Sequence, residues 1–336
     1  MPPRAILALF GLASLAACGR GEGDLGGDAG VVRFAVLSPE PPAALQRAWG
    51  PVIADMDAAT SLTVRPVFTD DAGSLAKGFR DRRYDIGLLT NQAALEVERR
   101  GGAEVFARTT EVGGGEGYYS VLIVAAKSRL TLDRVMKCDR TLTLGMGAPL
   151  STAGALAPET YLFAPRGRSP TQCFKAVRRA SPHANLLAVA SGQLDVATDN
   201  STALDSDRRK GRWEAGQVRV IWRSPILPEY PVVWRRDLDP AVKEKLRQFL
   251  LTYGQGDQPE AGAARARLAR LELGVFEPAD DSHLLPAKEM EATRAWLQAR
   301  ASGDKRKEDI ARRALNAVTA QRQALEARTG APAAAQ

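Results

Sequence analysis

Histidine, cysteine and aromatic residues are scarce in this chain of 336 residues, and each scarcity excludes a class of function. The two histidines, His183 and His283, lack metal-ligand spacing to a cysteine and offer little material for acid–base catalysis. No Gly-x-Ser-x-Gly elbow occurs either. Aromatic residues make up only 6% of the chain, whereas nucleic-acid binding requires basic patches with interleaved aromatics. We therefore expect no enzyme, no metal or cofactor, and no nucleic-acid partner.

The charge and hydropathy of the chain are those of an ordinary folded protein. The net charge is +7, and the basic stretches 265–270 and 305–313 contain no aromatic residue, so we interpret them as solvated helix faces. Beyond the N-terminus, no run reaches the roughly 20 apolar residues that span a bilayer. With 45% hydrophobic residues, the remaining chain can bury ordinary cores, and its length favours two lobes.

The N-terminus has the layout of a secretory signal. Arg4 supplies a positive charge, residues 5–13 form a short apolar run, and small residues precede Cys18. A cysteine there resembles the bacterial lipobox, in which the thiol receives diacylglycerol and becomes the new N-terminus. We predict that residues 1–17 are a lipoprotein signal peptide and that 18–30 are a flexible tether. The alternative is a plain secretory signal with an incidental cysteine.

Two further cysteines, Cys138 and Cys173, flank a predicted βα element. An exported protein meets an oxidising compartment, which favours a disulfide between them. Two free buried thiols are the alternative.

Strand and helix patterns alternate along the chain, which favours βαβ units on mostly parallel sheets. The predicted strands are 32–37, 62–68, 84–89, 118–126, 142–145, 194–198, 218–222 and 231–235. The predicted helices are 44–56, 73–82, 91–99, one after Ser151, 184–191, 240–253, and a helical stretch over 288–328 that breaks near Gly303.

This arrangement predicts an α/β fold of two lobes around a ligand-binding cleft. The expected units are lobe 1 (31–118 plus 225–290), lobe 2 (119–224), C-terminal helices (291–328) and a disordered tail (329–336).

The strongest local signal is the segment 145–154, Gly-Met-Gly-Ala-Pro-Leu-Ser-Thr-Ala-Gly, which follows a predicted strand and opens a helix. The first turn of a helix presents free N–H groups and partial positive charge, and the hydroxyls of Ser151 and Thr152 add donors. Together these groups can hold a tetrahedral oxyanion. A simple helix cap is the alternative.

The wider sequence resembles the periplasmic phosphonate-binding proteins of ABC transporters, from about Phe34 to about Arg328. The segments that carry the resemblance, in order, are 91–96, 117–124, 151–154, 185–190, 195–198, 221–225 and 231–235. It implies a class II-like, two-lobed periplasmic-binding-protein fold that delivers a phosphorus oxyanion to ABC permease subunits. It also implies a homodimer through the C-terminal helices. With Cys18 lipidated, the protein would be a membrane-anchored periplasmic lipoprotein.

The resemblance further implies the ligand-binding residues. Ser151, Thr152 and the Ala153 amide correspond to the family's Ser-Thr-Ser anion anchor, with the third hydroxyl lost at Ala153. Tyr118 matches a ligand-contacting tyrosine. The family histidine that helps to bind the anion falls at Pro182, directly before His183.

Three further positions depart from the family pattern. Asp71 stands where the family has an aromatic residue, and Thr202 and Tyr230 replace two carboxylates that bind the ligand amine. An ammonium buried without a countercharge costs on the order of several kcal/mol. Aminoethylphosphonate should therefore be disfavoured unless Asp71, Asp199 or Glu229 restores the charge.

These residues predict a phosphonate-type ligand with altered specificity. One alternative is a larger phosphonate ester or nucleoside-like solute that stacks on Tyr230 beside Tyr118. Another is a ligand sensor that transports nothing. Purely structural roles are the alternatives for three of these residues: Tyr230 as part of the core, Asp199 as the cap of a turn, and His183 on a solvated helix start.

Overall fold

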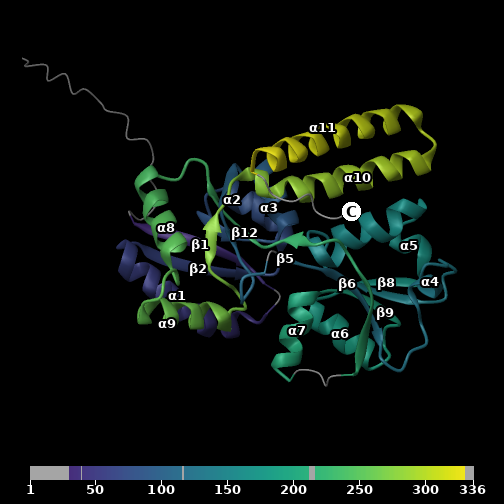
Figure 1. Cartoon of the computed structure of the whole chain (residues 1–336), viewed down its shortest axis with the longest axis horizontal. Helices are drawn as coiled ribbons and strands as arrows, with labels where there is room; N and C mark the ends of the chain where they lie inside the picture. Colours follow the sequence, from purple (N-terminus) through teal and green to yellow (C-terminus); the bar gives the residue numbers. More distant parts are fainter. Residues whose placement is uncertain (1–29, 39, 116, 212–215, 330–336) are drawn as a thin grey trace, which may run out of the picture.

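The computed structural model describes residues 30–38, 40–115, 117–211 and 216–329. Within these residues the chain forms two α/β lobes, each built on its own sheet, with two long helices along one side (Figure 1). The predicted signal peptide and Cys18 lie outside the described residues.

Lobe 1 is built on a six-stranded sheet of order β13-β4-β12-β3-β1-β2. Its strands are β1 (Val31–Leu37), β2 (Thr63–Thr69), β3 (Ile86–Leu88), β4 (Ala103–Thr109), β12 (Pro231–Arg235) and β13 (Phe276–Pro278). Its helices are α1 (Pro42–Thr60), α2 (Ala72–Arg80), α3 (Asn91–Arg100), α8 (Pro240–Thr252) and α9 (Pro259–Arg270). β1 runs parallel to β2 and β3, whereas β12 and β13 pair antiparallel.

Lobe 2 is built on a five-stranded sheet of order β10-β6-β9-β7-β8. Its strands are β6 (Ser120–Ala125), β7 (Thr143–Met146), β8 (Ala176–Arg179), β9 (Val196–Asn200) and β10 (Val218–Arg223). Its helical segments are α4 (Leu132–Val135), η1 (Thr152–Leu156), η2 (Glu159–Phe163), η3 (Ala164–Arg166), α5 (Pro170–Cys173), α6 (Pro182–Ala190) and α7 (Ser201–Arg209). Cys138 and Cys173 form a disulfide in this lobe.

Both sheets are mixed. Most strands of each sheet run in one direction, as predicted, but a reversed strand lies between two of them, β12 between β3 and β4 and β6 between β9 and β10. β7 runs parallel to β8 and β9, whereas β6 pairs antiparallel with both β9 and β10. In each lobe the antiparallel strands include one that follows a crossing between the lobes, β6 in lobe 2 and β12 in lobe 1. Such a strand enters its sheet from the opposite end, so its direction is reversed.

The two crossings between the lobes pair with each other. β5 (Gly117–Tyr118) and β11 (Leu227–Pro228) form a two-stranded antiparallel ribbon in which Leu227 lies opposite Tyr118. The single strand predicted over 118–126 is therefore divided into β5 and β6, with a break at Tyr119.

The cores follow the expected apolar patterns. In α1, Leu45, Trp49 and Ile53 recur at helical spacing and are buried against the sheet of lobe 1. Trp49 packs edge-on to Phe34 of β1, with ring centroids 5.4 Å apart.

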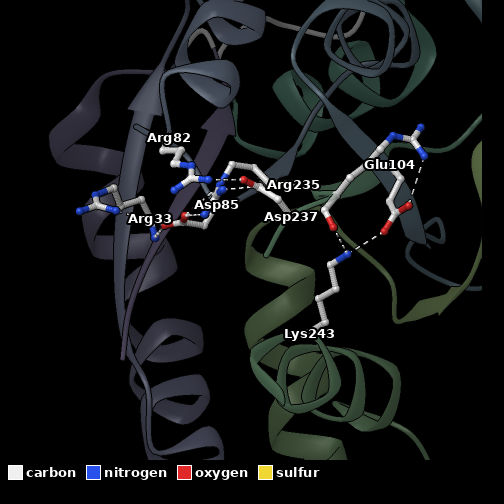
Figure 2. A network of polar contacts seen from close by, with 8 residues as sticks. Arg33, Arg82, Asp85, Glu104, Arg235, Asp237 and Lys243 are labelled. Carbon is white, nitrogen blue, oxygen red and sulfur yellow. Dashed lines mark hydrogen bonds and ion pairs between the residues drawn. The ribbon is translucent and has the colours of Figure 1, made fainter. Parts of the chain in front are cut away.

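A polar network closes the lobe 1 sheet at the amino end of β3 (Figure 2). The buried carboxylate of Asp85 accepts the Arg33 amide at 2.8 Å and the Arg235 guanidinium at 3.0 Å. Nearby, the Lys243 ammonium contacts Glu104 at 2.9 Å. Because charge this deep needs partners, the network ties β1, β3 and β12 together at this end. The carboxyl ends of β1 and β3 remain free to form a site.

The C-terminal helices connect the lobes. α10 (Leu285–Ser302), which follows the short η4 (Asp281–Leu284), packs beside α11 (Lys305–Thr329) (Figure 1). Glu291 of α10 pairs with Arg99 of lobe 1 at 2.6 Å, and Arg294 pairs with Glu159 of lobe 2 at 2.6 Å. None of the helices in the described ranges has the length and apolar character needed to cross a membrane.

Candidate functional site

A cleft of about 930 Å³ lies where residues of both lobes converge. In lobe 1 it is bordered by the carboxyl ends of β1 and β3, and in lobe 2 by the loop after β7, the position expected of a ligand in such sheets. Among the predicted site residues, those that line the cleft are Tyr118, Ser151, Thr152, Ala153, His183, Thr202 and Tyr230.

Ser151 and Thr152 open η1, the start of a helical run that continues to Arg166. Ser151 has extended backbone, and its Oγ accepts the Gly154 amide at 2.9 Å. The Thr152 Oγ1 accepts the Gln92 amide of lobe 1 at 3.0 Å. In both hydroxyls the oxygen accepts a hydrogen bond, so the O–H can act as a donor, and the Thr152 hydroxyl also interacts with the Tyr118 phenol. The first-turn amides of Thr152 and Ala153 add two more donors.

Close backbone packing shapes this anchor. The Gly147 amide donates to the Gly154 carbonyl at 2.9 Å, and a Cβ built on Gly154 would lie 2.7 Å from the Gly147 Cα. Only glycine allows that approach, because the obstructing atom is backbone. The two glycines therefore bring the β7 loop against the first turn of η1.

Two tyrosines stack beside the anchor. The rings of Tyr118 and Tyr230 lie 5.4 Å apart at an interplanar angle of 28°. Burial raises the pKa of both phenols above the ordinary value, and the nearby Glu229 carboxylate adds to the effect. Both therefore stay neutral and can donate hydrogen bonds. Tyr230 also packs against the core of lobe 1, so it lines the cleft and belongs to the core at once.

Thr202, in the first turn of α7, brings an unused polar atom to the cleft lining. Its Oγ1 is buried and has no hydrogen-bond partner in the part of the chain that the structure describes. A buried hydroxyl left unpaired costs about 1–3 kcal/mol. A ligand oxygen or nitrogen within reach would remove that cost.

The three carboxylates considered as replacements for the lost charge all lie outside the cleft lining. Asp71 caps α2 by accepting the Gly73 amide at 3.0 Å, and its neighbour Asp70 lines the cleft instead. Asp199 is a buried residue of β9, and its Oδ1 accepts the Asn200 amide at 2.7 Å. Burial raises the pKa of both Asp199 and Glu229 to about 7. None of the three presents a carboxylate to a ligand amine here.

His183 lies at the start of α6, after Ser181 and Pro182. Its Nδ1 contacts the Asp207 carboxylate at 3.0 Å, and its side chain is partly exposed. His183 lines the cleft, but its ring already contacts Asp207 of α7. This position is compatible both with a solvated helix start and with a ligand contact.

Sequence reasoning missed two residues that the fold brings to the anchor. Thr90 caps α3 and also donates from its Oγ1 to the Leu150 carbonyl of lobe 2 at 2.8 Å. Arg179, the last residue of β8, lines the cleft. No pattern in the sequence separates Arg179 from the other arginines; only the sheet order places it beside Gly147.

Known proteins resemble this chain over most of its length. Residues 34–284 match the family described as "ABC transporter, phosphonate, periplasmic substrate-binding protein". The phosphonates-binding periplasmic protein of Escherichia coli (strain K12) is 34% identical over 260 residues, which cover 77% of this chain and 75% of that protein.

Solved structures show the same arrangement. A binding protein component of an ABC phosphonate transporter from Pseudomonas aeruginosa superposes with a TM-score of 0.79 at 32% identity, over 89% of this chain and 98% of that one. A Prochlorococcus marinus (MIT 9301) protein solved with methylphosphonate gives a TM-score of 0.68 at 17% identity, over 78% of this chain and 97% of that one. The latter likeness concerns the fold alone.

Proposed function

The chain belongs to the family of periplasmic substrate-binding proteins of phosphonate ABC transporters, and we propose that it holds a phosphonate or related phosphorus oxyanion in the cleft between its lobes. It is a binding component and not an enzyme. The observation that carries the ligand proposal is the helix start at Ser151, Thr152 and Ala153, which presents two hydroxyls and two amides to the cleft. Donors converging on a helix N-terminus suit a tetrahedral oxyanion.

We further propose that specificity differs from that of aminoethylphosphonate binders. Thr202 and Tyr230 occupy the positions of the amine-binding carboxylates, and Asp71, Asp199 and Glu229 lie outside the cleft lining. At these two positions the ammonium of an aminophosphonate loses its hydration and gains no carboxylate partner, and Asp70, which also lines the cleft, is exposed to solvent.

Parallel calorimetric titrations of the purified protein test both proposals. We expect methylphosphonate to bind and 2-aminoethylphosphonate to bind at least about tenfold more weakly, the effect of roughly 1.4 kcal/mol. Phosphate serves as the third ligand. Absence of binding by all three would contradict the ligand class, and tight binding of the amino compound alone would contradict the altered specificity.

The variant Thr202→Glu tests the proposed reason for that specificity. A carboxylate at this position would face the ligand amine, so we expect T202E to gain about tenfold or more in affinity for 2-aminoethylphosphonate while methylphosphonate binding weakens. Thr202→Gln, of similar size but uncharged, is the matched control and should not show the gain. Equal effects of T202E and T202Q would show that charge at this position does not select the ligand.

The size of the cleft favours a second candidate, a larger phosphonate ester or nucleoside-like solute. Its volume of about 930 Å³ far exceeds a methylphosphonate, and the stacked tyrosines offer a flat apolar surface. Stronger binding of an aryl phosphonate ester than of methylphosphonate in the same titrations would favour this candidate.

We also propose that Cys18 carries the lipid anchor and that the C-terminal helices contribute dimer contacts. The support for the anchor is the signal layout in the sequence, since Cys18 lies outside the described residues. Mass spectrometry of the mature protein, with Cys18→Ser as control, tests the anchor. Light scattering of a chain that ends before α11 tests the dimer.

A further inference from the structure

We propose that Arg179 is a specificity-determining residue: its guanidinium supplies positive charge to the anion end of the cleft and selects doubly charged phosphorus oxyanions over singly charged analogues. This inference rests on the proposed function and deepens it. Ser151, Thr152 and Ala153 provide only neutral donors, which a phosphonate and a sulfonate would use equally well. A charged group at the same end increases the discrimination between these two anions, because its attraction grows with the charge of the ligand.

The backbone places Arg179 against the anchor. It is the last residue of β8, next to β7 in the sheet, and its Nη1 donates to the Gly147 carbonyl at 2.7 Å. Gly147 in turn packs on Gly154, whose amide is capped by Ser151. Gly147 therefore contacts both the Arg179 guanidinium and the anchor. Its side chain is 39% exposed and lines the cleft, so it is accessible to a ligand.

Its charge is not fully neutralised. The carboxylate partner of Arg179 is Glu159, at 3.6 Å, and the same carboxylate pairs more closely with Arg294 of α10, at 2.6 Å. One negative charge therefore serves two guanidiniums, and the group of three carries a net positive charge. Of the four carboxylates that line the cleft, Asp207 and Glu272 are engaged by His183 and Lys210, and Glu40 and Asp70 belong to lobe 1.

The geometry of the guanidinium suits this role. It carries five N–H donors in a planar fork, and the Gly147 carbonyl and Glu159 leave others available for phosphonate oxygens. Because Gly147 and Glu159 hold the side chain from two sides, little conformational entropy is lost when a ligand binds. Lysine at this position would keep the charge but not the fork.

Titration calorimetry on the purified full chain tests the inference with methylphosphonate and its isostere methanesulfonate, at a pH where the phosphonate carries two charges. Arg179→Met should weaken methylphosphonate binding about 10- to 100-fold and affect methanesulfonate, measured by competition, much less. The methylphosphonate affinity of Arg179→Lys should lie between those of the wild type and Arg179→Met. Arg178→Met is the matched control: it precedes Arg179 in β8, and strand alternation turns it to the other face of the sheet, away from the cleft lining.

The outcomes separate the inference from the function on which it rests. The inference would be overturned if the ratio of the methylphosphonate and methanesulfonate affinities were the same in R179M as in the wild type. Equal weakening of both anions is such a result, and it would mean that Arg179 only supports the Gly147 backbone. An equal effect of R178M would overturn it as well. A wild-type protein that binds no phosphonate would overturn the proposed function and this inference with it.

Discussion

At the scale of single residues, burial determines what each polar group can do. Thr152 and Asp199 are both almost fully buried, but Thr152 lines the cleft and Asp199 does not. The Asp199 Oδ2 has no hydrogen-bond partner among the described residues. An unpaired carboxylate in such a position favours its neutral form, so Asp199 links stability to pH.

The variant Asp199→Asn should stabilise the protein at alkaline pH. Burial raises the Asp199 pKa from 3.8 to about 7 in the folded chain. Between these values only the unfolded chain releases the proton, so the free energy of unfolding falls as pH rises and the loss is complete above about pH 7. Asparagine keeps the acceptor for the Asn200 amide and removes the charge. We expect D199N to gain about 1–3 kcal/mol at pH 8 and little at pH 4.

Urea denaturation at the two pH values measures this difference. The exposed Asp205 offers a matched control, and D205N should show no comparable pH dependence. A gain for D199N that is the same at both pH values would show that ionisation of Asp199 is not the cause.

Sequence reasoning identified the residues whose local context defines their role. Ser151 and Thr152 were predictable because a strand, a glycine loop and two hydroxyls precede a helix. The role of Asp71 was not predictable, because an aspartate can serve equally well as a helix cap or as a cleft residue. Only the direction of the side chain distinguishes Asp71, which caps α2, from Asp70, which lines the cleft. Arg179 was not predictable either, because only the order of strands in the sheet places it beside Gly147.

At the scale of elements, the segment that holds the anchor departs from regular α-helix. η1 and η2 are π-helical, with a short α-helical stretch between them. Such segments are rare and are frequent at functional sites. The sequence indicated a helix after Ser151 but not its type. The first turn of η1 packs closely against the β7 loop through Gly147 and Gly154.

The variant Gly154→Ala tests whether that packing forms the anchor. The added methyl group would meet backbone at 2.7 Å, so the first turn or the β7 loop must move. Forced packing of this kind costs about 1–3 kcal/mol, and we expect weaker ligand binding together with a lower melting temperature. Gly262→Ala in α9 is the matched control, because a Cβ there has open space. Unchanged ligand affinity in G154A would show that the glycine contact does not shape the anchor.

At the scale of the whole molecule, the lobes also meet at the edge of the cleft. Glu272, which follows α9 in lobe 1, accepts the Lys210 ammonium of lobe 2 at 2.8 Å and also contacts the Ser206 hydroxyl. Both partners belong to the α7 region, close to His183 and Asp207. The contact should favour the arrangement in which the lobes are close together.

The variant Glu272→Gln should release ligand faster. It keeps a hydrogen-bond acceptor for Ser206 but loses the ion pair, which is partly exposed and is worth up to about 1 kcal/mol. We expect the dissociation rate to rise up to about fivefold in stopped-flow displacement. Glu244→Gln on the exposed face of α8 is the control and should leave the rate unchanged. A rate for E272Q equal to the wild type would exclude a role for this contact in retaining ligand.

The two lobes were predictable from the alternation of strands and helices, and the order of strands within each sheet was not. The strands β12 and β6 read as ordinary buried strands in the sequence, with no mark of their direction. Their antiparallel pairing follows from the crossings between lobes, which join residues more than 100 positions apart. Such long-range pairing leaves no local pattern.

The stacked tyrosines also have a mechanical consequence, because they belong to the crossings themselves. Tyr118 is part of the β5–β11 ribbon, and Tyr230 follows it by two residues. Any solute that touches these rings therefore acts directly on the angle between the lobes. A permease that recognises one lobe angle acts on the same equilibrium. Thermodynamic linkage then requires reciprocity: the permease tightens solute binding by the same factor by which the solute tightens binding of the permease.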